Sequence, residues 1–150
     1  MNFVKYFMKI GSISESLELE KRISITPETA KKYISLGFEV SLIQNYGLHL
    51  GYNDDQFKEL GVKIISDEKE LISSLDIIIQ VGLLSEEKIS FIKEYQTLVG
   101  AFNPYSNKTK IENILKKKVN VFSLELLPRI TRAQSMDILS SQANLAGYKA

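Results

Sequence analysis

The stretch that decides the fold is TPETAKKYISLGFEVSLI, residues 26–43. Thr26 followed by Pro27 predicts a helix start, because threonine caps free backbone N–H groups and proline suits the first helical turn. Gly37 predicts the end of that helix. The alternation of apolar and polar residues over 38–43 then predicts a β-strand. A helix that leads directly into a strand is the repeating unit of an α/β fold.

Similar runs recur along the rest of the chain. Apolar runs of strand length lie at residues 8–10, 62–65, 76–81, 97–101 and 119–123, and helical patterns include residues 54–60 and a short helix that Ser85 opens. Strands that alternate with helices predict βαβ units with right-handed crossovers. We therefore expect an α/β fold with an open, doubly wound parallel sheet, Rossmann-like or flavodoxin-like.

The last segment has a different pattern. Small and apolar residues fall at helical spacing over residues 135–150, namely Met136, Leu139, Ala143, Gly147 and Ala150. Small side chains permit the close approach of another backbone, and no capping residue or proline ends this helix. We expect residues 1–134 to form one Rossmann-like domain and residues 135–150 to begin a long helix that leads to a further domain.

Composition excludes several function classes. The 150 residues, 44% apolar and 25% charged, fit one globular domain. The net charge of +1 gives no electrostatic footprint for nucleic acid. The longest aliphatic run, residues 77–79, is far short of the ~20 residues of a membrane span, and Lys5 and Lys9 interrupt the apolar start, which argues against a signal peptide. The basic run at residues 116–118 is interpreted as a solvated helix end.

Residues for acid–base, nucleophilic or metal chemistry are scarce. The chain has no cysteine and one histidine, His49, in a glycine-flanked loop. His49 could serve as a general base, but no acidic or nucleophilic partner stands at a telling spacing, so we interpret it as a loop histidine. One histidine without cysteine predicts no metal site. No strand–G-x-G-x-x-G–helix pattern occurs, so the fold is expected to lack its own glycine-rich dinucleotide fingerprint.

The densest polar cluster is PRITRAQSMD, residues 128–137. It follows the last expected strand, and ligands of open α/β sheets lie beyond the carboxyl ends of strands. Its arginines could pair with an anion, while Gln134 and Asp137 could hydrogen-bond amides and hydroxyls. The alternative is a solvated loop, with Ser135 as the N-cap of the last helix and Arg129 and Asp137 as a surface ion pair. The residues by themselves favour neither interpretation.

A resemblance to a known family starts from this cluster. Residues 128–150 resemble, almost residue for residue, a stretch of the alpha subunit of proton-translocating NAD(P) transhydrogenase, and they also resemble the N-terminal domain shared with alanine dehydrogenase. Upstream, residues 20–23 (EKRI) are similar to the family's E-x-R element, and Thr26 and Pro27 to its helix start. The resemblance spans nearly the whole chain.

This resemblance implies the first of two Rossmann-like domains of an NAD(H)-binding component, with the glycine-rich fingerprint in the second. It implies that Arg129 and Asp137 orient the nicotinamide end of NAD(H). Gln134 would reach toward the nicotinamide ribose of NADP(H) on a partner domain, and Ser140 would support the site. Direct hydride transfer from NADH to NADP+ needs positioning and exclusion of water rather than an acid–base side chain, which agrees with the residue inventory.

The resemblance also implies partners. These are the NADP(H)-binding domain and the membrane subunit of the transhydrogenase, together with a second copy of the component in a homodimer. The component would lie on the cytoplasmic side of the membrane without entering it. We expect the 150 residues alone to bind NAD(H) poorly and to be inactive.

Two other functions remain open. Alanine dehydrogenases hold and protonate pyruvate with an arginine, a lysine and a histidine. Arg22 resembles that arginine, but Gln80 stands at the lysine position and residues 99–104 contain no histidine. Imine chemistry requires a proton donor, so an amino-acid dehydrogenase is disfavoured, and Arg22 is interpreted as structural. The lost lysine is unusual for a transhydrogenase too, and Ile13 and Ser14 replace a proline and an arginine usual in the family. The third hypothesis is a non-enzymatic Rossmann-like interaction module.

Overall fold

Six parallel strands form one sheet in the computed structural model, which describes residues 7–149. The strands are β1 (Lys9–Ser12), β2 (Glu39–Ile43), β3 (Lys63–Ile65), β4 (Ile77–Ile79), β5 (Thr97–Gly100) and β6 (Asn120–Ser123). Their order across the sheet is β3-β2-β1-β4-β5-β6, and every neighbouring pair is parallel. This is the strand order of Rossmann folds. The expected doubly wound parallel sheet is confirmed, in its Rossmann-like form.

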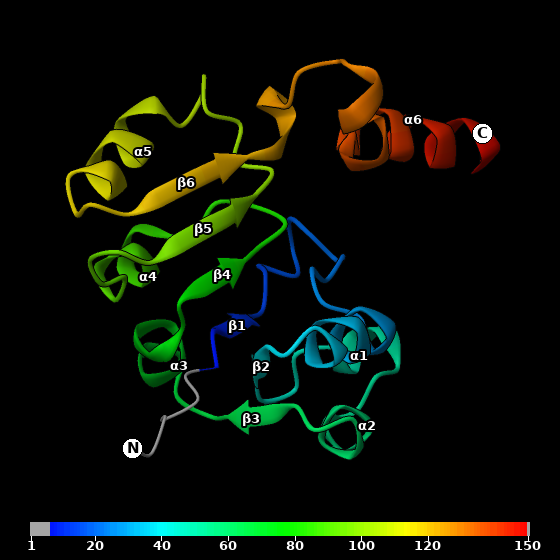
Figure 1. Ribbon diagram of the computed structural model, residues 1–150, viewed down its shortest axis with the longest axis vertical. Coiled ribbons are helices and arrows are strands. Elements are labelled where there is room, and N and C mark those ends of the chain that lie inside the picture. The colour runs from blue at the N-terminus through cyan, green and yellow to red at the C-terminus, as the bar shows by residue number, and fades with distance from the viewer. Residues whose placement is uncertain (1–6, 150) are drawn as a thin grey trace, which may run out of the picture.

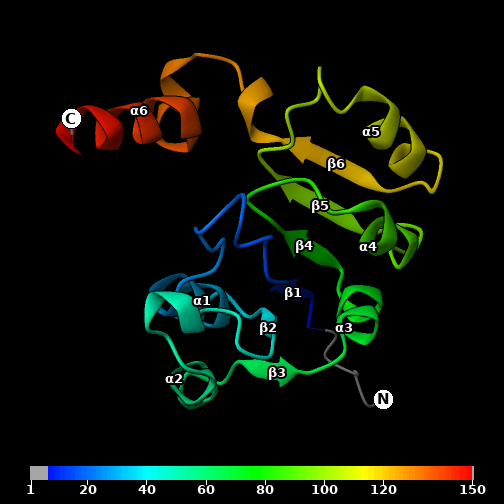
Figure 2. The same cartoon turned by 180° about the vertical axis from the view of Figure 1, so that it is seen from behind.

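Helices cover both faces of the sheet. The α-helices are α1 (Pro27–Ser35), α2 (Asp54–Glu59), α3 (Glu68–Ser74), α4 (Glu86–Ser90), α5 (Lys108–Leu115) and α6 (Ile138–Lys149). The short 3₁₀ helices are η1 (Leu48–Leu50), η2 (Leu124–Leu126) and η3 (Thr131–Met136). Helices α1 and α2 lie on one face, and α3, α4 and α5 lie on the other (Figures 1 and 2). Right-handed crossovers on either side of β1 produce this arrangement.

Capping side chains explain where the helices begin and end. Thr26 Oγ1 accepts a 3.2 Å hydrogen bond from the backbone N–H three residues on, and Ser85 caps α4 in the same way. Gly37 ends α1 with a φ of 92°, which glycine adopts without strain. Helix α3 is not predicted from the sequence. It is short and buries only Leu71 and Ile72, so its periodic signal is weak.

The core accounts for the apolar strands. Fully buried strand residues include Val40, Leu42, Ile78 and Leu98. A parallel sheet with both faces covered buries successive residues, which gives apolar runs rather than strict alternation. Strand β1 extends to Ser12, beyond the expected end at residue 10, because Gly11 pairs with Ser41 in β2. A Cβ at Gly11 would come within 2.2 Å of the Ser41 carbonyl oxygen, so the two strands approach this closely only with glycine there.

The basic run at residues 116–118 is not simply a solvated helix end. Helix α5 ends at Leu115 as expected. Lys117 Nζ, however, lies 2.9 Å, 3.3 Å and 3.4 Å from the carbonyl oxygens of Ile89, Ser90 and Ile92. These carbonyls lie at the C-terminal end of α4, where a cation is favourable. Lys116 and Lys118 are exposed, as expected for a solvated helix end, whereas Lys117 is half-buried because a neighbouring helix end supplies acceptors.

Helix α6 begins at Ile138 and not at residue 135. Asp137 Oδ1 accepts hydrogen bonds from the backbone N–H groups of Leu139 (3.0 Å) and Ser140 (3.1 Å). Asp137 is therefore the capping residue, and Ser135 lies within η3. The interpretation of Ser135 as the N-cap was wrong. Ala150, expected in this helix, and residues 1–6, which include Lys5, lie outside the described residues.

Helix α6 projects away from the sheet, past the end of β6 and over the α1 side of the domain (Figure 1). It has no buried residue, and a Cβ added at Gly147 would meet no atom within 4 Å. The expected stripe of small residues thus has no partner helix within residues 7–149. In the same range, no helix combines the length and apolarity needed to cross a bilayer.

Candidate functional site

A pocket of about 530 Å³ lies beyond the carboxyl end of β6, between η2, η3 and the start of α6. It is lined by the four residues selected from the sequence, which are Arg129, Gln134, Asp137 and Ser140. Its volume lies within the range of small-molecule sites. The fold therefore brings the four side chains to one cavity at the edge of the sheet where α/β proteins bind ligands.

Hydrogen bonds hold the Asp137 carboxylate in place at the pocket. Its Oδ2 accepts a 2.6 Å hydrogen bond from Ser140 Oγ. This bond, the helix N–H groups and the positive charge of Arg129 lower the pKa of Asp137 below its ordinary value. The carboxylate is therefore ionised at neutral pH. An ionised carboxylate offers about four acceptor positions, and three of those of Asp137 are occupied, so about one remains for a ligand.

Arg129 and Gln134 are exposed donors of the pocket. Among the described residues, no ion pair within 4.0 Å joins Arg129 to Asp137, in contrast to the surface pair of the alternative interpretation. Ala133 is buried and its N–H donates to the Ile130 carbonyl oxygen at 2.9 Å, which anchors η3. The Gln134 amide is thus carried by an anchored turn, and the Arg129 guanidinium lies just before that turn, so both are available to a ligand.

Glu125 also lines the pocket, although it was not among the residues selected from the sequence. Its Oε1 accepts from Asn103 N at 2.5 Å, and its Oε2 accepts from Ser123 Oγ at 2.6 Å. Burial raises the pKa of Glu125, but these hydrogen bonds outweigh burial and lower the pKa overall. The residue ties the loop after β5 to the pocket wall. In the sequence, the only signal for Glu125 as a site residue is its position close after the last strand.

The crevice between β1 and β4, where the strand order reverses, is filled by the chain's own side chains. Gln80 is buried, and its Oε1 accepts from Ser12 Oγ at 2.5 Å and from Ile13 N at 2.9 Å. Its Nε2 donates to Glu15 Oε1 at 3.2 Å. Tyr46 OH donates to Ser12 Oγ at 2.9 Å and extends the network. Gln80 therefore serves as a buried structural bridge between β1, β4 and the loop that follows β1.

Glu15 lies in the same crevice, next to Gln80. Its Oε1 also accepts the backbone N–H groups of Val81 (2.7 Å) and Gly82 (3.3 Å), just after β4. Burial is the main reason that the pKa of Glu15 is raised. In a dinucleotide site, a short glycine-rich turn leads from the first strand into a helix that faces the pyrophosphate. Here residues 13–26 separate β1 from α1, so the crevice offers no phosphate cradle.

Two further residues of interest lie outside the pocket. His49 is exposed and its Nε2 lies 2.8 Å from the Lys21 carbonyl oxygen, so it fixes the loop after β1. Arg22 binds Glu20 and reaches Gln142 in α6. In the described part of the chain, no group of three His, Cys, Asp or Glu side chains is placed to hold a metal ion.

Comparison with known proteins identifies the family of the chain. The family model described as alanine dehydrogenase/PNT, N-terminal domain, matches residues 11–146. The first part of NAD(P) transhydrogenase subunit alpha from Rickettsia prowazekii is 40% identical over 147 residues, which cover 95% of this chain and 38% of that protein. Alanine dehydrogenase 1 of Staphylococcus aureus (strain Mu50) is 25% identical over 142 residues, with coverages of 95% and 37%.

A solved structure agrees with these matches. The crystal structure of transhydrogenase from Sinorhizobium meliloti superposes with a TM-score of 0.86 at 37% identity, covering 94% of this chain and 42% of that one. The chain spans about two fifths of the length of these relatives. Because the family model matches almost the whole sequence, the chain belongs to the family of alanine dehydrogenase/PNT N-terminal domains.

Proposed function

We propose that this chain is the first domain of the NAD(H)-binding component of a proton-translocating NAD(P) transhydrogenase, in which hydride passes directly from NADH to NADP+. The observation that carries the proposal is the convergence of Arg129, Gln134, Asp137 and Ser140 on one pocket. The relatives named transhydrogenase, at 37% and 40% identity, support it over the alanine dehydrogenase at 25%.

The pocket residues fit the nicotinamide end of a dinucleotide. The carboxamide of that ring carries an NH₂ donor and a carbonyl acceptor. Asp137 offers an ionised acceptor to this group, and Arg129 offers donors. Leu127 and Ile130 supply apolar wall on which a ring can pack. The crevice between β1 and β4 does not fit a pyrophosphate, so the rest of the dinucleotide would bind to a second domain outside residues 1–150.

The bound nicotinamides supply the hydride and its acceptor, and the protein supplies orientation. Arg129 and Asp137 would hold one ring at its carboxamide, while Gln134 would face the ribose of the second nucleotide. Direct transfer moves no proton at the reacting carbons, so the lack of His and Cys in the pocket is compatible with the reaction. Orientation alone is a large effect, because a misplacement of about 1 Å costs roughly 100-fold in rate.

The proposal includes partners and a place in the cell. The NADP(H)-binding domain would dock on the pocket side, and the membrane subunit would carry the proton. A second copy of this component would complete a homodimer, at the cytoplasmic side of the membrane. The name of the Rickettsia prowazekii relative, one portion of a subunit, supports membership of a larger assembly.

The deciding experiment uses the full-length protein together with its NADP(H)-binding partner. We expect NADH-dependent reduction of NADP+, and no oxidation of NADH that depends on pyruvate and ammonia. The reverse result would make the protein an alanine dehydrogenase. Neither activity, together with no binding of NADH, would favour the interaction module. Residues 1–150 alone should bind NADH poorly, and micromolar affinity of that fragment would contradict the proposed division of the site.

A further inference from the structure

Arg22 is fixed on the loop between β1 and α1 by a neighbouring carboxylate. Its Nε donates to Glu20 Oε1 at 2.8 Å and its Nη2 donates to Glu20 Oε2 at 2.6 Å. The Arg22 backbone N–H also donates to Glu20 Oε1 at 2.9 Å. Two parallel bonds between a guanidinium and a carboxylate set both the position and the plane of the guanidinium. One edge of the guanidinium is left free to bind elsewhere.

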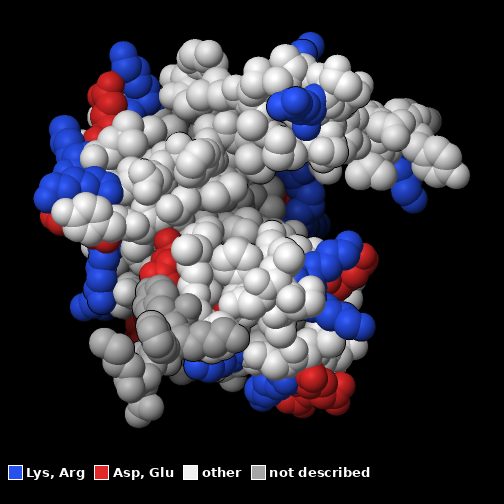
Figure 3. All heavy atoms as spheres, in the orientation of Figure 1, with Lys and Arg blue, Asp and Glu red and all other residues white. Residues whose placement is uncertain are grey.

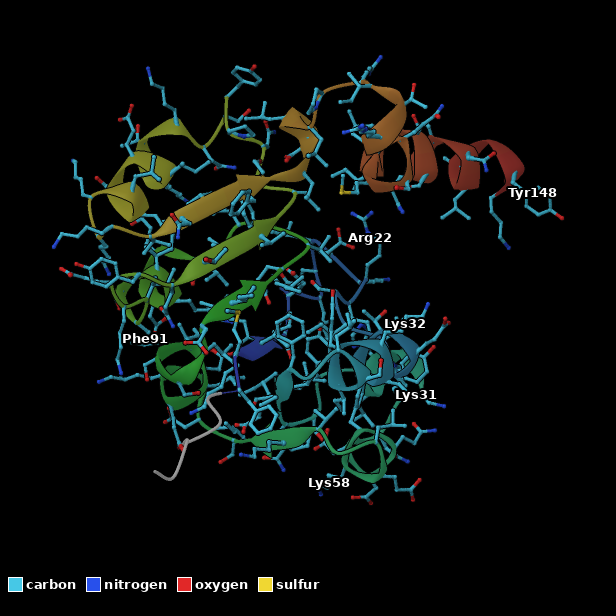
Figure 4. The ribbon with its side chains drawn as sticks, in the orientation of Figure 1. Arg22, Lys31, Lys32, Lys58, Phe91 and Tyr148 are labelled. Carbon is cyan, nitrogen blue, oxygen red and sulfur yellow. The ribbon has the colours of Figure 1, made fainter. Side chains whose placement is uncertain are left out.

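The free edge binds helix α6. Arg22 Nη1 donates to Gln142 Oε1 at 2.8 Å, a contact between residues 120 positions apart. Figure 4 shows Arg22 on the loop beneath α6, at the side where the helix overhangs the domain. Within residues 7–149, the other side-chain hydrogen bonds of α6 stay within the helix and its cap. This bond is therefore the polar tie between the helix and the body of the domain.

The loop that carries Arg22 is itself held at several points. His49 Nε2 contacts the Lys21 carbonyl oxygen at 2.8 Å. Glu15 binds the backbone beyond β4, and Tyr46 OH accepts from Ser24 N at 2.9 Å. Arg22 thus lies on a loop that hydrogen bonds connect to the segments after β4 and after β2.

Helix α6 in turn carries one wall of the candidate site. Leu139, Ser140 and Ala143 line the pocket. Gln142 is the residue directly before Ala143 in the same helix. No residue of α6 is buried, and the surface of its projecting part is largely uncharged (Figure 3). Because α6 buries no residue, packing contributes little to holding it against the domain.

We propose that Arg22 is a positioning residue, which ties α6 to the sheet through Gln142 and so sets the geometry of the nicotinamide pocket without touching the ligand. This inference rests on the proposed function. The Arg22 side chain is 55% exposed, and exposed ion pairs contribute little to global stability. The effect of the tie should therefore appear in ligand affinity and in the mobility of α6, and not in thermal stability.

The test compares Arg22→Ala, Gln142→Ala and the double variant in the full-length protein, by titration of NADH fluorescence. We expect each single variant to weaken NADH binding by roughly 3- to 10-fold and the double variant to be no weaker than the singles, because coupled residues are not additive. Backbone amides of α6 should exchange hydrogen faster in all three. Lys32→Ala is the matched control, since Lys32 forms an exposed pair with Glu28, and it should behave as wild type.

Other outcomes overturn the inference. If Arg22→Ala weakens binding while Gln142→Ala does not, Arg22 contacts the ligand directly. If the two effects add, the residues act separately, and if both variants bind as wild type, the tie has no role. Arg22→Lys keeps the charge but loses the two-bond fork, so its affinity should fall close to that of Arg22→Ala. Wild-type protein that fails to bind NADH at all would instead refute the proposed function.

Discussion

Asp137 Oδ2 accepts a 2.6 Å hydrogen bond from Ser140 Oγ, while Oδ1 of the same carboxylate caps the first turn of α6. The start of the helix and the acceptor of the pocket are thus a single group. Its direction in the pocket is set by the turn that it caps. A ligand that binds Asp137 would meet an acceptor that is already oriented.

The two roles of Asp137 can be separated by substitution. Asn caps helices as well as Asp does, so Asp137→Asn should keep the start of α6, while it removes the charge and replaces one acceptor oxygen with an NH₂ group. We expect NADH affinity in the full-length protein to fall about tenfold, because hydrogen bonds to charged groups are the stronger ones. Asp137→Ala should lose both roles, which faster hydrogen exchange at Leu139 and Ser140 would reveal. Unchanged affinity in the Asn variant would show that the charge serves no ligand.

The buried hydrogen bonds of Gln80 between β1 and β4 are predicted to stabilise the fold. Gln80→Leu would leave Ser12 Oγ and Ile13 N without the acceptor that each has now. A buried donor left unpaired costs about 1–3 kcal/mol, and each kcal/mol lowers the melting temperature by roughly 2–4 °C in a domain of this size. We expect a drop of several degrees in thermal unfolding. A variant as stable as wild type would mean that water replaces the amide.

Glu15 should make stability depend on pH. Burial raises its pKa, so the protonated form favours folding and this contribution is lost as pH rises through the raised pKa. The backbone hydrogen bonds from Val81 and Gly82 and the positive charge of Lys88 lower this pKa, but burial, with a contribution from the negative charge of Glu20, outweighs them. Glu15→Gln keeps an acceptor oxygen but cannot ionise.

Melting temperatures of wild type and Glu15→Gln at a series of pH values test this expectation. The variant should gain on wild type as the pH rises from acid to neutral. A constant difference between the two proteins across that range would show that the carboxyl group does not titrate within it.

The fold could be predicted from the sequence because its signals are local. Thr26 and Gly37 mark a helix through backbone groups within a few residues, and apolar runs follow from a sheet covered on both faces. The order of the strands is not local. Rossmann-like and flavodoxin-like sheets share the same alternation of elements, so the sequence pattern did not separate them. The structure did, through the pairing of β1 with β4.

The residues of the candidate site could be predicted from the sequence for a similar reason. Arg129, Gln134 and Asp137 lie within one short stretch, so a motif could contain them, although their roles remain predictions. Contacts between distant segments left no such trace. Arg22 hydrogen-bonds to Gln142, 120 positions away, and Lys117 to the carbonyl group of Ile89, 28 positions away. An arginine or a lysine at these positions does not indicate which distant residue it binds. The prediction of Ser135 as the N-cap of the last helix was wrong because serine and aspartate are both good capping residues, and the sequence does not distinguish them.

Gln134 offers the most direct test of the proposed function. Gln134→Asn keeps the amide and withdraws it by one methylene, so the charge of the pocket and the cap of α6 are untouched. In the full-length protein with its NADP(H)-binding partner, the rate of hydride transfer from NADH to NADP+ should fall about 100-fold, while NADH affinity stays near that of wild type. A transfer rate equal to that of wild type would contradict the claim that this pocket aligns the two nicotinamides.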